Sequence, residues 1–191
     1  MSQQFETLRA YCSRLTDDHL DEDHSEVEVQ VGDRTVRYQQ RTVTARGKLE
    51  DVPVVVMYQK YFFYGFGDSR PAFTDVLELF TTARKLPVEA TIRKANFWTK
   101  LKRLMGRGGI RGPHALYTVY EVQPLEGAFS PFPDALNDAL LGLLQGSHAL
   151  DFQLQSDTGF NGIYPWSTCS TVDALDRVVQ QQLHVARMIG S

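Results

Sequence analysis

The amino-acid sequence predicts an α+β protein, with a mainly antiparallel sheet of about six to eight strands and N-terminal, middle and C-terminal helices packed on it. Two observations support this fold class. Strand patterns are joined by short turn sequences, and such strands pair antiparallel because parallel neighbours need a long crossover. Segments with helical spacing stand at the beginning, in the middle and at the end of the chain. We expect one domain over residues 1–191, with a weak seam near residues 106–113.

The N-terminal part of the chain predicts one helix followed by a hairpin. Apolar side chains at steps of 3, 4 and 3 residues indicate a helix over residues 3–18. These side chains are Phe5, Leu8, Cys12 and Leu15. The acidic residues 17–23 are expected to end the helix and to form a solvated loop. Alternation in EVEVQV then predicts a strand over residues 26–31, and Gly32-Asp33 favours a two-residue turn because glycine tolerates a positive φ.

Further strands are expected up to residue 93. The β-branched run VPVVVMY around Pro53 is the strongest strand pattern, and it favours a central position in the sheet. Residues 47–51 are expected to form the turn before this strand, and the Gly- and Pro-containing residues 65–71 the loop after the aromatic stretch that follows it. The remaining strands of this part are predicted over residues 34–46, 73–81 and 86–93.

Three helices and three strands are expected in the second half of the chain. Asn96 can cap a short helix, since its side-chain oxygen can accept a hydrogen bond from an unpaired backbone N–H. The next helix begins at Ser130-Pro131 and presents leucines to the core, and Ser170 or Thr171 caps the last one. The strands are predicted over residues 114–122, 150–155 and 160–166.

The charge distribution is strongly polarised along the chain. Residues 84–112 hold nine basic side chains and one acid, whereas residues 1–33 hold nine acids and two arginines, in a protein of net charge −3. This separation of charge indicates either that the two regions pair inside the fold or that one of them forms a binding surface.

The basic span contains an amphipathic helix pattern, NFWTKLKRLM, at residues 96–105. Its apolar face is formed by Phe97, Leu101, Leu104 and Met105, with Trp98 at the border. Downstream, GRGGIRG exposes backbone N–H groups beside two arginines, a combination that suits phosphate or carboxylate. The candidate anionic-ligand residues are Arg93, Lys94, Lys100, Lys102, Arg103, Arg107 and Arg111.

Three interpretations of this segment are open. In the first, the apolar face packs on the sheet, while the basic face is solvated or pairs with the acidic N-terminal region. In the second, the segment contacts an anionic ligand, a nucleic acid or a membrane. In the third, it binds a protein partner.

Aromatic side chains gather between residues 58 and 73, and a strand here places alternate rings on opposite faces. One set can fill the core, and the other needs a cover, either within the fold or at an interface. The candidate interaction surface therefore joins two residues of this block to two of the amphipathic segment: Tyr61, Phe63, Phe97 and Trp98.

The sequence carries no nucleophile elbow, P-loop or dinucleotide fingerprint. Residues 17–24, DDHLDEDH, offer donors for a divalent ion, but their spacing is neither that of an EF-hand nor that of an HExxH zinc site. Cys12 and Cys169 are expected to be free buried thiols. Cys169 precedes a helix whose N-terminus could stabilise a thiolate, although no histidine is paired with it in the sequence. We expect no catalytic residue, metal ligand or cofactor.

Several motifs together resemble a loose group of bacterial α+β proteins without an assigned activity. The motifs are LPVEATI, NFWTKLKRLMG, ALYTVYEVQ with a leucine-rich helix after it, and, upstream, GKLEDVPVVVMY. The resemblance implies a compact α+β domain and no particular chemistry.

We expect a binding protein rather than an enzyme, acting through contact with another protein or with a copy of itself. The alternative is a binder of nucleic acid, phospholipid or a phosphorylated small molecule through residues 93–111, and a metal-dependent hydrolase is a remote alternative. The longest apolar run is far shorter than the roughly 20 residues that a membrane span needs. With no signal-like N-terminus either, the expected location is the cytoplasm.

Overall fold

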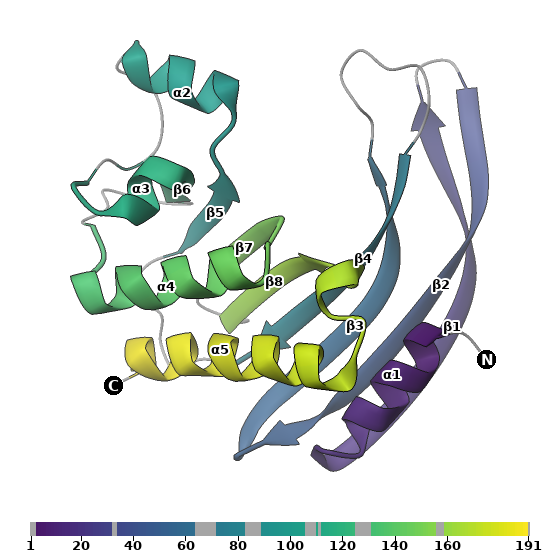
Figure 1. Cartoon of the computed structure of the whole chain (residues 1–191). Helices are drawn as coiled ribbons and strands as arrows, with labels where there is room; N and C mark the ends of the chain where they lie inside the picture. The colour runs from purple at the N-terminus through teal and green to yellow at the C-terminus, as the bar shows by residue number, and fades with distance from the viewer. Residues whose placement is uncertain are drawn as a thin grey trace.

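The computed structural model describes residues 3–31, 34–63, 72–82, 89–105, 110, 112–124, 131–155 and 159–190. Within them, eight antiparallel strands form one open sheet in the order β1-β2-β3-β4-β8-β7-β5-β6 (Figure 1). The strands are β1 (Thr16–Val31), β2 (Arg34–Leu49), β3 (Val52–Phe63), β4 (Ala72–Thr81), β5 (Ala90–Lys94), β6 (Tyr120–Pro124), β7 (Asp151–Gln155) and β8 (Gly159–Pro165). The α+β class and the antiparallel sheet are thus confirmed.

Helices α1, α4 and α5 cover the same face of this sheet (Figure 1). The helices are α1 (Gln3–Cys12), α2 (Phe97–Leu104), α3 (Ala115–Val119), α4 (Asp134–Gly146) and α5 (Val172–Gly190), with the 3-10 turn η1 (Trp166–Thr168) before α5. None of the described helices is long and apolar enough to cross a membrane.

The core lies between the sheet and these three helices. Alternate residues of β3 point toward the helices, so that Val54, Val56 and Tyr58 are buried. The leucine spacing of α4 gave its buried face correctly, and α5 buries its apolar face against β4 and β8. The predicted strand around Pro53 is β3, which lies inside the sheet between β2 and β4 as expected.

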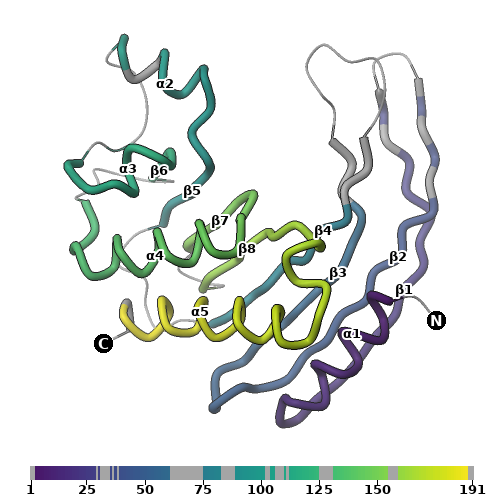
Figure 2. The backbone as a smooth tube through the Cα atoms, in the orientation of Figure 1, coloured from purple at the N-terminus to yellow at the C-terminus, as the bar shows by residue number. Residues whose placement is uncertain are grey.

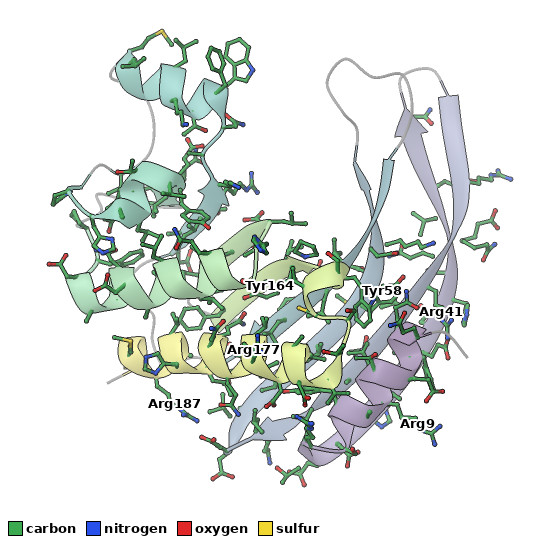
Figure 3. All side chains as sticks on the ribbon, viewed as in Figure 1. Arg9, Arg41, Tyr58, Tyr164, Arg177 and Arg187 are labelled. Atoms are coloured by element: carbon green, nitrogen blue, oxygen red, sulfur yellow. The ribbon has the colours of Figure 1, made fainter. Side chains whose placement is uncertain are left out.

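A buried polar contact joins α5 to the sheet. The side-chain amide of Gln182 donates to the carbonyl of Leu79 and to the hydroxyl of Thr81, both at 3.0 Å. Its oxygen accepts a hydrogen bond of 2.7 Å from the hydroxyl of Tyr164 on β8 (Figure 3). Both side chains are fully buried, so this hydrogen bond replaces the contacts with water that the Tyr164 hydroxyl and the Gln182 oxygen would make in the unfolded chain.

The N-terminal prediction was partly wrong. Helix α1 ends at Cys12 rather than near residue 18, and the acidic residues that follow form strand β1 instead of a loop. The reason lies in the partner strand: β2 is rich in arginine, and its cations pair with the acids of β1. These ion pairs, made over a long sequence separation, favour the extended conformation of the acidic segment.

The hairpin between β2 and β3 turns later than predicted. Strand β2 continues through Gly47 to Leu49, and Glu50 and Asp51 form the turn with φ values of 50° and 64°. Positive φ at both central residues matches a type I′ hairpin turn. Gly47 has another role, because a Cβ atom there would lie 2.6 Å from the Cβ of Leu15. Glycine at this position lets the side chain of Leu15, just before β1, lie against the backbone of β2.

Two boundaries differ in the second half of the chain. Residues 114–122 begin with helix α3, because the Nδ1 atom of His114 accepts a hydrogen bond from the backbone N–H of Leu116 and caps that turn. Strand β6 follows as Tyr120–Pro124. Helix α4 begins at Asp134, later than Ser130-Pro131, after Pro133 at the N-cap.

The cap expected at Asn96 is confirmed, and of the two caps offered for the last helix, Ser170 and Thr171, the structure has Thr171. Strand β5 covers only the last residues of the predicted strand 86–93 and extends one residue beyond it. The turn predicted at residues 32–33, the loop at 65–71 and the first residues of the predicted strand, 86–88, lie outside the described residues.

Candidate interaction surface

The acidic and basic regions of the chain lie at opposite edges of the sheet. Strand β1 forms one edge and β6 the other, with α2 attached beside β5 and β6 (Figure 1). Pairing of the acidic N-terminal region with the basic segment, one of the expectations above, is therefore wrong for the part that the structure describes. The acids of β1 pair with β2 instead, as Glu28–Arg37, Glu22–Arg41, Asp21–Arg46 and Asp17–Lys48.

Arg93 is not a free cation. Its Nε and Nη2 atoms both donate to Oδ2 of Asp151 on the neighbouring strand β7, at 3.0 and 2.9 Å. The hydrogen bond to Asp151 raises the pKa of Arg93, with a smaller contribution from the charge of Glu121 on β6. The candidate anionic site thus loses Arg93, whose charge is held by carboxylates of its own sheet.

Helix α2 is held to the sheet by its first turn. Asn96 Oδ1 accepts a hydrogen bond of 2.9 Å from the backbone N–H of Thr99, the N-cap arrangement. The hydroxyl of Thr99, which is buried, lies 2.8 Å from Oε2 of Glu121 on β6 and can donate to it. This contact fixes where α2 begins, while the helix itself stands apart from α4 and α5 (Figure 2).

Four of the five apolar side chains of the amphipathic segment are exposed, and Leu101 is half-buried. The exposed fractions are 72% for Phe97, 66% for Trp98, 86% for Leu104 and 58% for Met105. The rings of Phe97 and Trp98 stack edge to face with centroids 5.8 Å apart, so they form one aromatic pair. The expectation that the apolar face packs on the sheet is therefore wrong for these four side chains, and α2 contacts the sheet through Thr99.

Cations accompany this exposed apolar face. Lys94, at the end of β5, and Lys100, on α2, are exposed, and neither forms an ion pair with another described residue. Lys102 and Arg103 belong to α2 by their backbone, but their side chains lie outside the described part, as do Arg107 and Arg111 altogether. We call Phe97, Trp98, Lys100, Leu104 and Met105 the α2 surface.

The other two residues of the predicted interaction surface are not joined to the α2 surface. Tyr61 and Phe63 lie on β3 and pair through the backbone with Thr74 and Ala72 of β4. Their side chains are outside the description. Since β3 is separated from β5 by β4, β8 and β7 in the sheet, the aromatic block and α2 are different parts of the molecule.

The histidines and acids of residues 17–24 are spread over both faces of β1, because side chains alternate along a strand. His19 contacts Asp21, and His24 contacts Glu22, which also pairs with Arg41. Across the described residues, no group of three or more histidine, cysteine or acidic side chains is arranged to hold a metal ion.

Both cysteines are free and buried, as predicted. Burial raises the pKa of the Cys169 thiol to about 11, an effect that the hydroxyl of Thr168 only partly opposes. The surroundings therefore keep this thiol neutral. They do not favour the thiolate that the position of Cys169 before a helix suggested from the sequence.

At pH 8, alkylation of Cys169 by iodoacetamide in a Cys12→Ser variant is expected to be about 100-fold slower in the folded protein than in urea, because two pKa units lower the thiolate fraction by that factor. Mass spectrometry over time measures this. Equal rates in the folded and unfolded protein would contradict the burial of the thiol.

A polar pocket that the sequence did not indicate lies on the helix-bearing face, between α1 and strands β2, β3 and β4. Its volume is about 230 Å³, and its lining residues are Gln4, Gln39, Arg41, Tyr58, Lys60 and Asp75. No local motif could have revealed it, because its lining residues come from helix α1 and from three strands that are far apart in the sequence.

Comparison with known proteins identified no matching family model, no curated protein and no solved structure. The resemblance to bacterial α+β proteins without assigned activity therefore stays a prediction.

Proposed function

We propose that this chain is a non-enzymatic interaction protein whose α2 surface docks into an apolar groove with an acidic rim on another protein. The exposure of the apolar side chains of α2 is the observation that carries the proposal. Monomeric proteins seldom expose a group of large apolar side chains without a use for it, and such groups mark interaction sites.

The composition of the α2 surface favours a protein partner. Aromatic residues, leucine and methionine bind by filling pockets, and Trp is among the residues that contribute most to interfaces. Lys94 and Lys100 flank the apolar residues, so an acidic rim on the partner would complement them. An amphipathic helix in a groove is a recurrent recognition mode.

A second copy of this chain is a poorer partner. The acids of β1 are the main acidic feature of the molecule, and arginines and a lysine of β2 already pair with them. A basic helix approaching this strand would gain little, because those carboxylates have cationic neighbours. An anionic membrane is disfavoured by the length of α2, eight residues, which gives about 12 Å of helix.

The test is a comparison of captured proteins between the wild type and a Trp98→Ala, Leu104→Ala variant. We expect the variant to bind an acidic partner at least about 30-fold more weakly, since one aromatic hot spot contributes about 2 kcal/mol. Titration of the purified partner by calorimetry gives the dissociation constants. Leu150→Ala is the matched control, because Leu150 is also an exposed leucine but lies outside α2.

Three outcomes would overturn the proposal. Unchanged affinity of the α2 variant would exclude the helix as the docking element. Sedimentation of the wild type, but not the variant, with phosphatidylserine vesicles and no protein partner would make the site a membrane contact. A concentration-dependent mass in light scattering that the variant abolishes would identify self-association.

A further inference from the structure

The two N-terminal hairpins separate at a defined point in the sheet. Backbone pairing between β2 and β3 extends to Val43 and Tyr58 and ends there among the described residues. Beyond it, β2 pairs only with β1, up to Arg34 with Val31, and β3 only with β4, up to Phe63 with Ala72. Figure 1 shows β1 with β2 and β3 with β4 diverging as two arms. The polar pocket is lined by strand residues from both arms, Gln39 and Arg41 of β2, Tyr58 and Lys60 of β3 and Asp75 of β4.

Lys60 and Asp75 face each other across β3 and β4 but do not form an ion pair. Directly opposed cross-strand residues are close enough for such a pair, and opposite charges usually use the opportunity. The ammonium of Lys60 has no hydrogen-bond partner among the described residues. The pocket therefore offers a cation and an anion side by side, each with capacity for another contact.

Tyr58 orients the carboxylate of Asp75. Its hydroxyl donates to Oδ1 of Asp75 at 2.9 Å, and Oδ2 has no partner in the described chain. Burial, together with the hydrogen bond to Asp75, raises the pKa of Tyr58, so the hydroxyl remains a donor at neutral pH. The ring of Trp166 packs edge to face on Tyr58 at 5.3 Å and fixes it in place.

Arg41 supplies a second cation to the pocket and lies beside Tyr58 near the N-terminal end of α1 (Figure 3). One terminal nitrogen pairs with Glu22, but the Nε atom is buried without a hydrogen-bond partner. A buried donor without an acceptor is costly, and a ligand oxygen would remove that cost. The amides of Gln4 and Gln39 complete the polar lining.

We propose that this pocket binds a small zwitterion of the α-amino acid class. The ligand carboxylate contacts Arg41 and Lys60, and its ammonium group contacts the free oxygen of Asp75. The cavity of about 230 Å³ equals the liquid volume of about eight water molecules, at about 30 Å³ each, which is the size range of a small amino acid. The site is independent of α2, which lies at the far edge of the sheet.

The experiment is isothermal titration calorimetry of the whole chain with each of the twenty L-amino acids, and with acetate and methylamine as half-ligands. We expect at least one amino acid to bind, and acetate and methylamine to bind at least tenfold more weakly. Lys60→Gln and Asp75→Asn are each expected to weaken the amino acid at least tenfold. Asparagine can still accept the hydrogen bond of Tyr58, so Asp75→Asn tests the charge rather than the fold.

Lys48→Gln is the control, because Lys48 is an exposed lysine of the same sheet whose partner, Asp17, lies outside the pocket. It should bind like the wild type. Absence of binding by all twenty amino acids would overturn the proposal. Equal binding of acetate and the amino acid, with no effect of Asp75→Asn, would overturn it as well and would define a simple anion site.

Discussion

Replacing Gln182 by leucine is expected to lower the free energy of unfolding by about 3 kcal/mol. The substitution keeps an apolar stem of similar size but removes the hydrogen bonds to Tyr164, Leu79 and Thr81. The Tyr164 hydroxyl is then left fully buried without its partner, and each such group costs about 1–3 kcal/mol. Urea denaturation followed by circular dichroism measures the change.

Substitution of the neighbouring residue, Gln181, is the control for Gln182→Leu. Gln181 also lies on α5 but borders the surface groove between α4 and α5, so Gln181→Leu should change the stability by less than about 0.5 kcal/mol. Equal effects at the two positions would show that the loss does not come from the buried contact.

A double substitution separates the hydrogen bond from the packing. Removing both partners of a buried hydrogen bond costs much less than removing one. The Gln182→Leu, Tyr164→Phe double variant is therefore expected to be more stable, by about 1–2 kcal/mol, than the sum of the two single variants predicts. Strict additivity would contradict the pairing of these two side chains.

Gly162→Ala is expected to destabilise the protein by about 3 kcal/mol, at the upper end for overpacking. Gly162 and Tyr164 lie on the same face of β8, and the ring of Tyr164 leans over the glycine. A Cβ atom at residue 162 would lie 2.6 Å from two ring carbons of Tyr164. The ring of Tyr164 would have to move, and its hydroxyl would then lose the hydrogen bond to Gln182. Thermal and urea unfolding measure the loss.

Gly142→Ala is the matched control for this substitution. Gly142 lies inside α4, and no atom stands within 4 Å of the Cβ that alanine would add. Alanine there is expected to stabilise the protein by about 0.5–1 kcal/mol, because it has the higher helix propensity. A Gly162→Ala variant as stable as the wild type would show that the Tyr164 ring does not require this glycine.

Periodicity in the sequence predicted the parts of the fold in which burial repeats locally. The leucines of α4 indicate which face of that helix is apolar, and that face is buried. Asn96 and Thr171 were found for a similar reason, since a cap depends on atoms two or three residues away. These features need no knowledge of distant partners.

The acidic strand β1 and the exposed helix α2 could not be predicted in the same way. The extended conformation of residues 17–23 depends on cations about 20 to 30 residues later, in β2. The amphipathic pattern of α2 indicates which side of the helix is apolar, but it does not indicate whether another part of the protein packs on that side. The pocket residues Lys60 and Asp75 became neighbours only through the register of β3 and β4.

The position of β1 has a consequence for behaviour at high concentration. As an outermost strand it presents unpaired backbone groups along one side, which in an uncharged segment would invite edge-to-edge growth into fibrils. Seven of its sixteen residues are acidic, and three of these, Asp18, Asp23 and Glu26, form no ion pair with another described residue, so their charges make two such edges repel each other. The acidic composition of this edge strand thus disfavours edge-to-edge association of two molecules.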